Sequence, residues 1–146
     1  MSTQVTFYAV RGGGLHAWTA KLVEAAWTKG KRVLLYCSSG AEAEAIDEYL
    51  WTFRDDAFIP HGIDSTEGSA ENSALPVLIT TSATNTNDAS ILLQLGHADL
   101  DFAGGFKNVI ELVDREDETK LTASRERYRA WKAYAKEHDV TVDYKA

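Results

Sequence analysis

The glycine-rich segment after the first apolar run is the sharpest candidate for cofactor chemistry. Residues 12–17 read G-x-G-x-x-A, a spacing with which a strand-to-helix turn lets a dinucleotide pyrophosphate approach a helix N-terminus. Such a motif needs an acidic residue near the end of the second strand to bind the ribose. The second apolar run instead ends in Tyr36, Cys37 and Ser38. The sequence therefore favours an ordinary turn and leaves a nucleotide- or dinucleotide-binding enzyme that uses Gly12–Gly14 as the alternative function.

The other reactive side chains form no catalytic pattern. Cys37 is the only cysteine, and Ala43 stands where a phosphate-cleaving cysteine loop would place an arginine. The four histidines are far apart in the chain, and none belongs to a pair with metal-ligand spacing. We therefore expect a buried structural thiol, surface or capping histidines, and no catalytic residue, metal or cofactor.

Length and composition indicate one soluble domain. The chain has 146 residues, of which 45% are hydrophobic and 25% charged, so a single domain over 1–146 can bury a core. No apolar run approaches the roughly 18–20 residues that cross a bilayer, and the N-terminus lacks the pattern of a signal peptide. With a single cysteine, a cytoplasmic location without membrane association is expected.

Charge is distributed unevenly along the chain. The net charge is −7, so strong direct binding to DNA through phosphate neutralisation is not expected. Yet residues 119–136 carry six cations against one acid, and 55–106 contain no lysine or arginine. A local cluster of positive charge on a chain of negative net charge favours a small anionic partner. The simpler alternative is that these cations form a solvated helix face.

Strand and helix patterns alternate along the chain. This alternation predicts a single-domain, three-layer α/β/α fold with a mainly parallel, Rossmann-like central sheet. We expect strands at 5–10, 32–37, 77–81 and 109–113, with an edge strand at 140–142. Helices are expected at 15–29, 39–50, 88–95 and 119–138, and 62–76 reads as a flexible surface loop.

The last helix carries two stripes of side chains. An apolar stripe should pack on the sheet, and a cationic stripe runs beside it. Cations next to aromatic rings suit a peptide with carboxylates and an apolar side chain; stacking of single-stranded DNA on Tyr128 and Trp131 is another interpretation. The apolar stripe is Leu121, Ser124, Tyr128, Trp131 and Ala135, and the cationic stripe is Arg125, Arg129, Lys132 and Lys136.

Aromatic residues also cluster around the turn that follows the second expected helix. Trp51, Phe53, Phe58, Ile59 and Pro60 form either the edge of the core or an exposed patch. Because tryptophan and phenylalanine commonly anchor protein interfaces, we expect Phe58 to be at least partly exposed and to contact a partner subunit.

These clusters make the sequence resemble the chi subunit of bacterial DNA polymerase III, part of the clamp-loader assembly. The resemblance covers nearly the whole chain and includes VTFY at 5–8, KGKRVL at 29–34, DEYLW at 47–51, FIPH at 58–61, ED at 116–117 and RERYRAW at 125–131. It implies an α/β fold and a non-catalytic accessory subunit of the holoenzyme. Such a subunit binds the psi subunit, which tethers it to the clamp loader, and the acidic, phenylalanine-ended tail of single-stranded DNA-binding protein.

The resemblance also assigns residues to the two surfaces. Trp51, Phe58 and Pro60 match the psi-facing patch, for which a helicase is a further candidate partner. The residues that match the tail pocket directly are Val113, Arg125 and Tyr128. The family's further lysine in this pocket corresponds to Lys120 only after a one-residue shift, and Arg129 or Lys132 are the alternatives to it.

Overall fold

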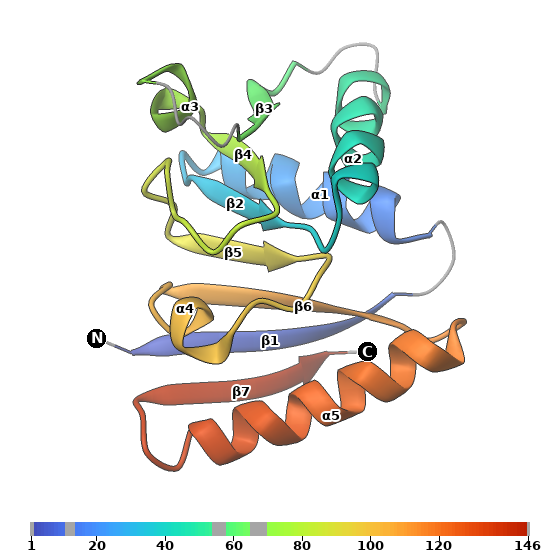
Figure 1. Cartoon of the computed structure of the whole chain (residues 1–146), viewed down its shortest axis with the longest axis vertical. Helices are drawn as coiled ribbons and strands as arrows, with labels where there is room; N and C mark the ends of the chain where they lie inside the picture. The colour runs from blue at the N-terminus through green and yellow to red at the C-terminus, as the bar shows by residue number, and fades with distance from the viewer. Residues whose placement is uncertain (1, 11–13, 54–57, 65–69, 146) are drawn as a thin grey trace.

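The structure is a computed structural model that describes residues 2–10, 14–53, 58–64 and 70–145. Its strands are β1 (Thr3–Val10), β2 (Val33–Tyr36), β3 (His61–Ile63), β4 (Val77–Thr80), β5 (Ile91–Gln94), β6 (Asn108–Asp114) and β7 (Val140–Lys145). They form one sheet in the order β3-β4-β2-β5-β6-β1-β7, and all neighbouring strands are parallel (Figure 1). The expected parallel sheet is therefore confirmed, including the edge strand near the C-terminus.

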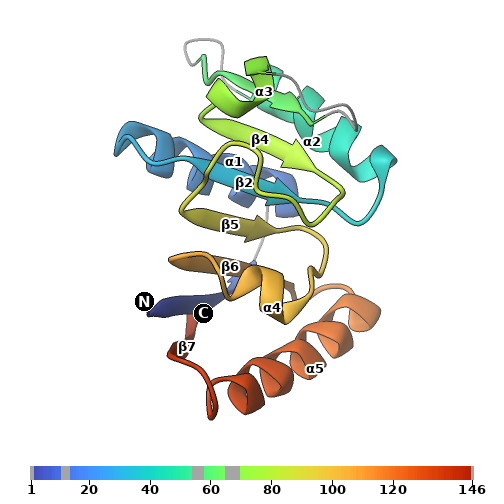
Figure 2. The same ribbon diagram turned by 60° about the vertical axis from the view of Figure 1, so that its left-hand side comes forward.

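Helices cover both faces of this sheet. They are α1 (Gly14–Thr28), α2 (Gly40–Thr52), α3 (Ala70–Ala74), α4 (Leu100–Ala103) and α5 (Glu118–Tyr134). The first two pack on one face, and α4 and α5 pack on the other (Figure 2). This arrangement confirms the three-layer architecture. No helix among the described residues is long and apolar enough to cross a bilayer.

The two faces hold separate hydrophobic cores. Val23 of α1 and Ile46 of α2 pack against the β2, β4 and β5 face on one side. On the other side Phe7, Val109 and Trp131 form the core beneath α5. Because the central strands are covered on both faces, β4 and β5 are buried along their whole length, as parallel sheets require.

Side-chain caps fix where the main helices begin. The Ser39 hydroxyl accepts a hydrogen bond from the backbone N–H of Glu42 at 3.2 Å, as the sequence predicts. The Glu42 carboxylate reaches back to the N–H of Ser38 at 2.9 Å, one residue before the usual capping-box position. Asp117 caps α5 by accepting from the N–H of Lys120 at 3.1 Å. The Asp117 cap therefore fixes the start of α5 at Glu118, a short connection after the end of β6.

Two expectations about local structure are wrong. Residues 88–95 do not form a helix, because Ile91–Gln94 pairs with β2 on one side and β6 on the other. The segment 62–76 is not loop throughout, since His61–Ile63 is a strand and Ala70–Ala74 a short helix. Residues 65–69 of the expected loop lie outside the described part of the chain.

The C-terminal elements differ slightly in length from the sequence prediction. Helix α5 ends at Tyr134 rather than near His138. The His138 ring stacks on Tyr134 with 3.8 Å between centroids, and its Nδ1 lies 3.0 Å from the Tyr134 carbonyl oxygen. This contact covers the helix end before the chain turns into β7, which is longer than expected and pairs with β1 through Lys145.

Candidate binding groove

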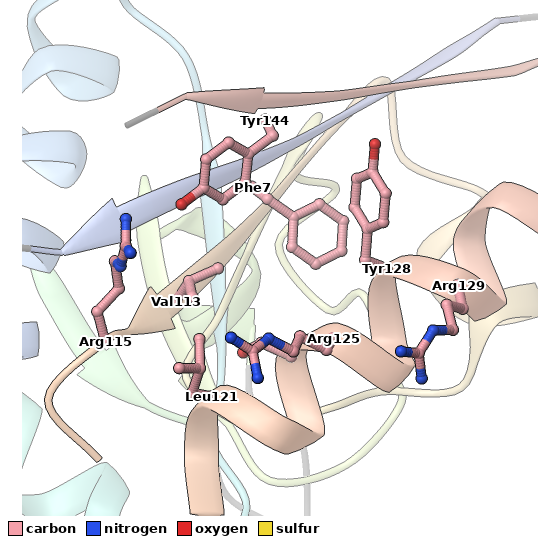
Figure 3. A pocket seen from close by; sticks show the side chains of 9 residues that line it. Phe7, Val113, Arg115, Leu121, Arg125, Tyr128, Arg129 and Tyr144 are labelled. Atoms are coloured by element: carbon pink, nitrogen blue, oxygen red, sulfur yellow. The ribbon is translucent and has the colours of Figure 1, made fainter. Parts of the chain in front are cut away.

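A groove of about 490 Å³ opens between α5 and the edge of the sheet (Figure 3). Elements far apart in the sequence form its walls: α5 on one side, the start of the β6–α5 connection on another, and the last strand on a third. The lining residues are Phe7, Val113, Arg115, Leu121, Ser124, Arg125, Tyr128, Arg129 and Tyr144. The groove therefore exists only in the folded chain.

The floor of the groove is apolar. Phe7 and Val113 are 1% and 4% exposed, and their strands pair so that both side chains face α5. The Tyr128 ring meets Phe7 edge-on, with 5.2 Å between centroids and an interplanar angle of 74°. An apolar group that enters here would be enclosed by aromatic and aliphatic carbon.

Three arginines surround this floor. Arg115, Arg125 and Arg129 are exposed, and no acidic side chain lines the groove within the described ranges. No ion pair or hydrogen bond joins the guanidinium groups of these three arginines to another described residue. The groove thus presents cations without counter-charges next to an apolar floor, a combination that suits a carboxylate with an apolar neighbour.

The residues predicted for the tail pocket come together only in part. Val113, Arg125, Tyr128 and Arg129 all line the groove. Lys132 lies just outside it, with its Nζ 5.9 Å from the centroid of the Tyr128 ring. Lys120 instead lines a second hollow of about 380 Å³, which lies at the carboxyl ends of β2, β5 and β6.

Sequence reasoning missed Phe7, Arg115 and Tyr144 as groove residues. Leu121 and Ser124 were assigned only to the stripe that packs on the sheet. The cross-strand register puts Phe7 opposite Tyr144, which gives both residues the same face. Nothing in local periodicity connects these positions, because they become neighbours only through the pairing of β1 with β7.

A buried polar network lies beneath α5 and corrects two sequence interpretations. Oε2 of Glu111 accepts hydrogen bonds from Arg127 Nε at 2.9 Å, from Trp131 Nε1 at 2.9 Å and from Gln94 Nε2 at 2.5 Å. Arg127, one of the six cations counted in 119–136, is therefore paired with a buried carboxylate and does not add to the free positive charge of that segment. Trp131 is 0% exposed, so it cannot stack on a DNA base.

The second predicted surface is exposed around α2 and β3, and β3 is the edge strand opposite β7. Phe58 is 64% exposed and Trp51 47%, which confirms the expected exposure of Phe58. Their ring centroids are 5.6 Å apart, and Trp51 also lies 4.3 Å from the ring of His61. Pro60 is half-buried beside them, whereas residues 54–57 lie outside the described part.

His61 supports this patch from below. It is buried, contrary to the expectation of a surface or capping histidine. Its Nδ1 is 2.7 Å from the Ile59 carbonyl oxygen, and its Nε2 is 3.2 Å from the carbonyl oxygen and 3.4 Å from the carboxylate of Asp47. The His61 ring therefore connects β3 to α2, and the Trp51 ring packs against it.

The candidate reactive residues are described only in part. Cys37 is buried, as expected, and burial, with a smaller contribution from the Glu42 carboxylate, raises the pKa of its thiol to about 12. Gly14 begins α1 with φ +79°, but Gly12 and Gly13 of the glycine motif lie outside the described residues. No group of three metal-ligating side chains occurs in the part of the chain that the structure describes.

Known proteins resemble this chain over most of its length. The family model for "DNA polymerase III chi subunit, HolC" matches residues 1–139. DNA polymerase III subunit chi of Pseudomonas aeruginosa is 30% identical over 133 residues, covering 89% of each chain. The Escherichia coli subunit chi is 35% identical over 107 residues, which cover 73% of this chain and 70% of that protein.

A structural neighbour shares the fold alone. The C-terminal domain of the DEAD-box protein Dbp5 superposes with a TM-score of 0.56 over 98% of this chain and 89% of that chain, at 14% identity. The family match and the relatives carry the assignment. This chain belongs to the chi subunit family of DNA polymerase III.

Proposed function

We propose that this accessory subunit of DNA replication is a non-catalytic linker between two protein partners. Its α5 groove binds the acidic, phenylalanine-ended tail of single-stranded DNA-binding protein. Its Trp51–Phe58 surface binds the psi subunit and, through psi, the clamp loader. A helicase that used the same aromatic surface would compete with psi.

The observation that carries this proposal is the pairing of free arginines with an apolar floor. The Arg125 guanidinium projects from the same helix as Tyr128 and lies next to Val113 in the groove (Figure 3). A tail that ends in phenylalanine offers a carboxylate and a ring on one residue. Arg125 forks onto the carboxylate while Tyr128 and Val113 enclose the ring.

The aromatic patch supports a second, separate protein contact. An exposed phenylalanine and an exposed tryptophan with 5.6 Å between their rings form a preformed apolar surface. Large apolar side chains that contact each other in solvent mark protein interfaces more often than isolated ones do. The buried His61 beneath Trp51 fixes the position of this surface.

Charge and burial favour a peptide over DNA as the ligand of the groove. The chain carries a net charge of −7, which repels a long polyanion. Trp131, the second ring that stacking would require, is enclosed in the core. Of the two rings that the stacking interpretation used, only Tyr128 lines the groove, and its edge contact with Phe7 holds it against the floor.

The proposal is tested by titrating the full chain with a synthetic acidic peptide that ends in phenylalanine. The same experiment uses a peptide without the terminal phenylalanine and a single-stranded oligonucleotide at physiological salt. Binding of the first peptide alone supports the groove assignment. Equal binding of both peptides, or tighter binding of the oligonucleotide, overturns it.

A further inference from the structure

Arg115 and Tyr144 together form the wall of the groove that does not belong to α5. We infer that Arg115 makes binding depend on an acidic side chain upstream of the ligand's terminal residue. This inference rests on the proposed function and extends it. It names a specificity determinant outside the helix that carries the predicted tail contacts.

The position of Arg115 is set by β6 rather than by α5. It directly follows Asp114, the last residue of β6, and its side chain is exposed at the groove. Figure 3 shows Arg115 on one side of Val113 and Arg125 on the other, with the two side chains arriving from different elements. The two guanidinium groups therefore approach a bound ligand from different directions.

The chemistry of the ligand follows from this separation. With Arg125 on the terminal carboxylate, Arg115 faces the residues that precede the terminal one. Arg115 forms no hydrogen bond or ion pair with another described residue, so it loses no internal partner when it binds a carboxylate. The ligand class is thus a peptide with a free C-terminus, an apolar last side chain and an aspartate or glutamate shortly before it.

Tyr144 completes this wall from the last strand. It lies opposite Phe7 in the pairing of β7 with β1, lines the groove and is 48% exposed. The family model ends at residue 139, so this part of the groove lies beyond the matched region. The wall therefore depends on a strand that the family match does not include.

The test combines protein variants with peptide variants in a calorimetric binding cycle. The three peptides are the acidic phenylalanine-ended parent, its C-terminal amide, and a version with every aspartate changed to asparagine. For the full chain, we expect Arg115→Ala to weaken the parent peptide about three- to tenfold, as loss of a charge-assisted contact at an exposed wall does. The Arg115→Ala variant should still bind the C-terminal amide more weakly than the parent peptide. It should bind the asparagine-substituted peptide and the parent with nearly the same affinity.

Two controls separate this wall from general charge effects. Lys31→Ala removes one positive charge next to the amino end of β2, an interior strand of the sheet, and Lys31 does not line the groove. This variant should leave all three affinities within twofold of the unmodified chain. Arg125→Ala should bind the C-terminal amide and the parent peptide with nearly the same affinity, and should still bind the asparagine-substituted peptide more weakly.

The outcomes distinguish the inference from the proposed function. If the unmodified chain does not bind the parent peptide, the proposed function and the inference both fail. If Arg125→Ala weakens binding but Arg115→Ala behaves like Lys31→Ala, only the inference is overturned. Full sensitivity of Arg115→Ala to the asparagine exchange would also overturn it.

Discussion

The indole N–H of Trp131 donates a hydrogen bond of 2.9 Å to Oε2 of Glu111, and both residues are buried. Arg127 donates to the same oxygen, so one carboxylate on β6 holds two side chains of α5. This anchor fixes the helix on the sheet. Because Arg125 and Tyr128 flank Arg127 on the helix, it also fixes the helix wall of the groove.

Glu111→Ala should lower the free energy of unfolding by about 3–5 kcal/mol, because it leaves Arg127 as a largely buried charge without its partner. Urea unfolding followed by tryptophan fluorescence measures this change. Glu116→Ala, which removes an exposed carboxylate from the neighbouring loop, is the control and should change stability by less than about 0.5 kcal/mol. Equal stability of the two variants would show that the network does not anchor α5.

The sequence contained a signal for this network that periodicity did not reveal. Glu111 interrupts the apolar run of β6, and a charged residue in a buried strand needs a partner. Its partners Arg127 and Trp131 are 16 and 20 residues away. The presence of a partner could be predicted, but its identity could not, because only the packing of α5 selects Arg127 over the other cations of the helix.

The fold was more predictable than the groove. Alternating strands and helices, together with the Ser39 cap, are local patterns, and they predicted the parallel three-layer architecture. Strand β5 was misassigned as a helix because a short apolar run such as Ile91–Leu95 has no decisive period. Tyr144 was missed because the pairing of β7 with β1, and not spacing along the chain, brings it to the groove. Arg115 was missed because it lies in the connection between β6 and α5 and not on the helix that carries the cationic stripe.

Phe58→Ala should abolish binding of the psi subunit, at a cost of about 2–4 kcal/mol for an interface hot spot, and leave the fold intact. Phe58 is 64% exposed, so its removal creates no cavity in the core. Co-purification with psi from the same organism, together with thermal unfolding, measures both effects. Trp27→Ala, which removes another exposed aromatic ring, 39% exposed on α1, is the matched control and should retain psi.

Lys132→Ala should weaken binding of the acidic tail peptide by less than about 1 kcal/mol and should flatten its salt dependence. Lys132 does not line the groove, and its ammonium, 5.9 Å from the centroid of the Tyr128 ring, acts on the ligand through a screened field. Calorimetry at two salt concentrations compares its slope with that of the unmodified chain. An unchanged slope together with a large loss of affinity would place Lys132 in direct contact with the ligand.

Cys37 should resist thiol reagents in the folded protein. Burial raises the pKa of its thiol to about 12, so the reactive thiolate is scarce at pH 8 and the sulfur is enclosed. Ellman's reagent should therefore react with Cys37 only after denaturant is added. Rapid modification of the native chain at pH 8 would contradict the buried position of this side chain.

The central claim, that the α5 groove binds a phenylalanine-ended acidic tail, is tested most directly by calorimetry of Arg125→Ala with the tail peptide. Loss of the Arg125 guanidinium from the terminal carboxylate should reduce the binding free energy by about 1.5–3 kcal/mol, which corresponds to roughly a ten- to hundredfold loss of affinity. Deleting the terminal phenylalanine of the peptide should reduce binding to the unmodified chain as well. If Arg125→Ala binds the peptide as tightly as the unmodified chain, the groove is not the tail-binding site.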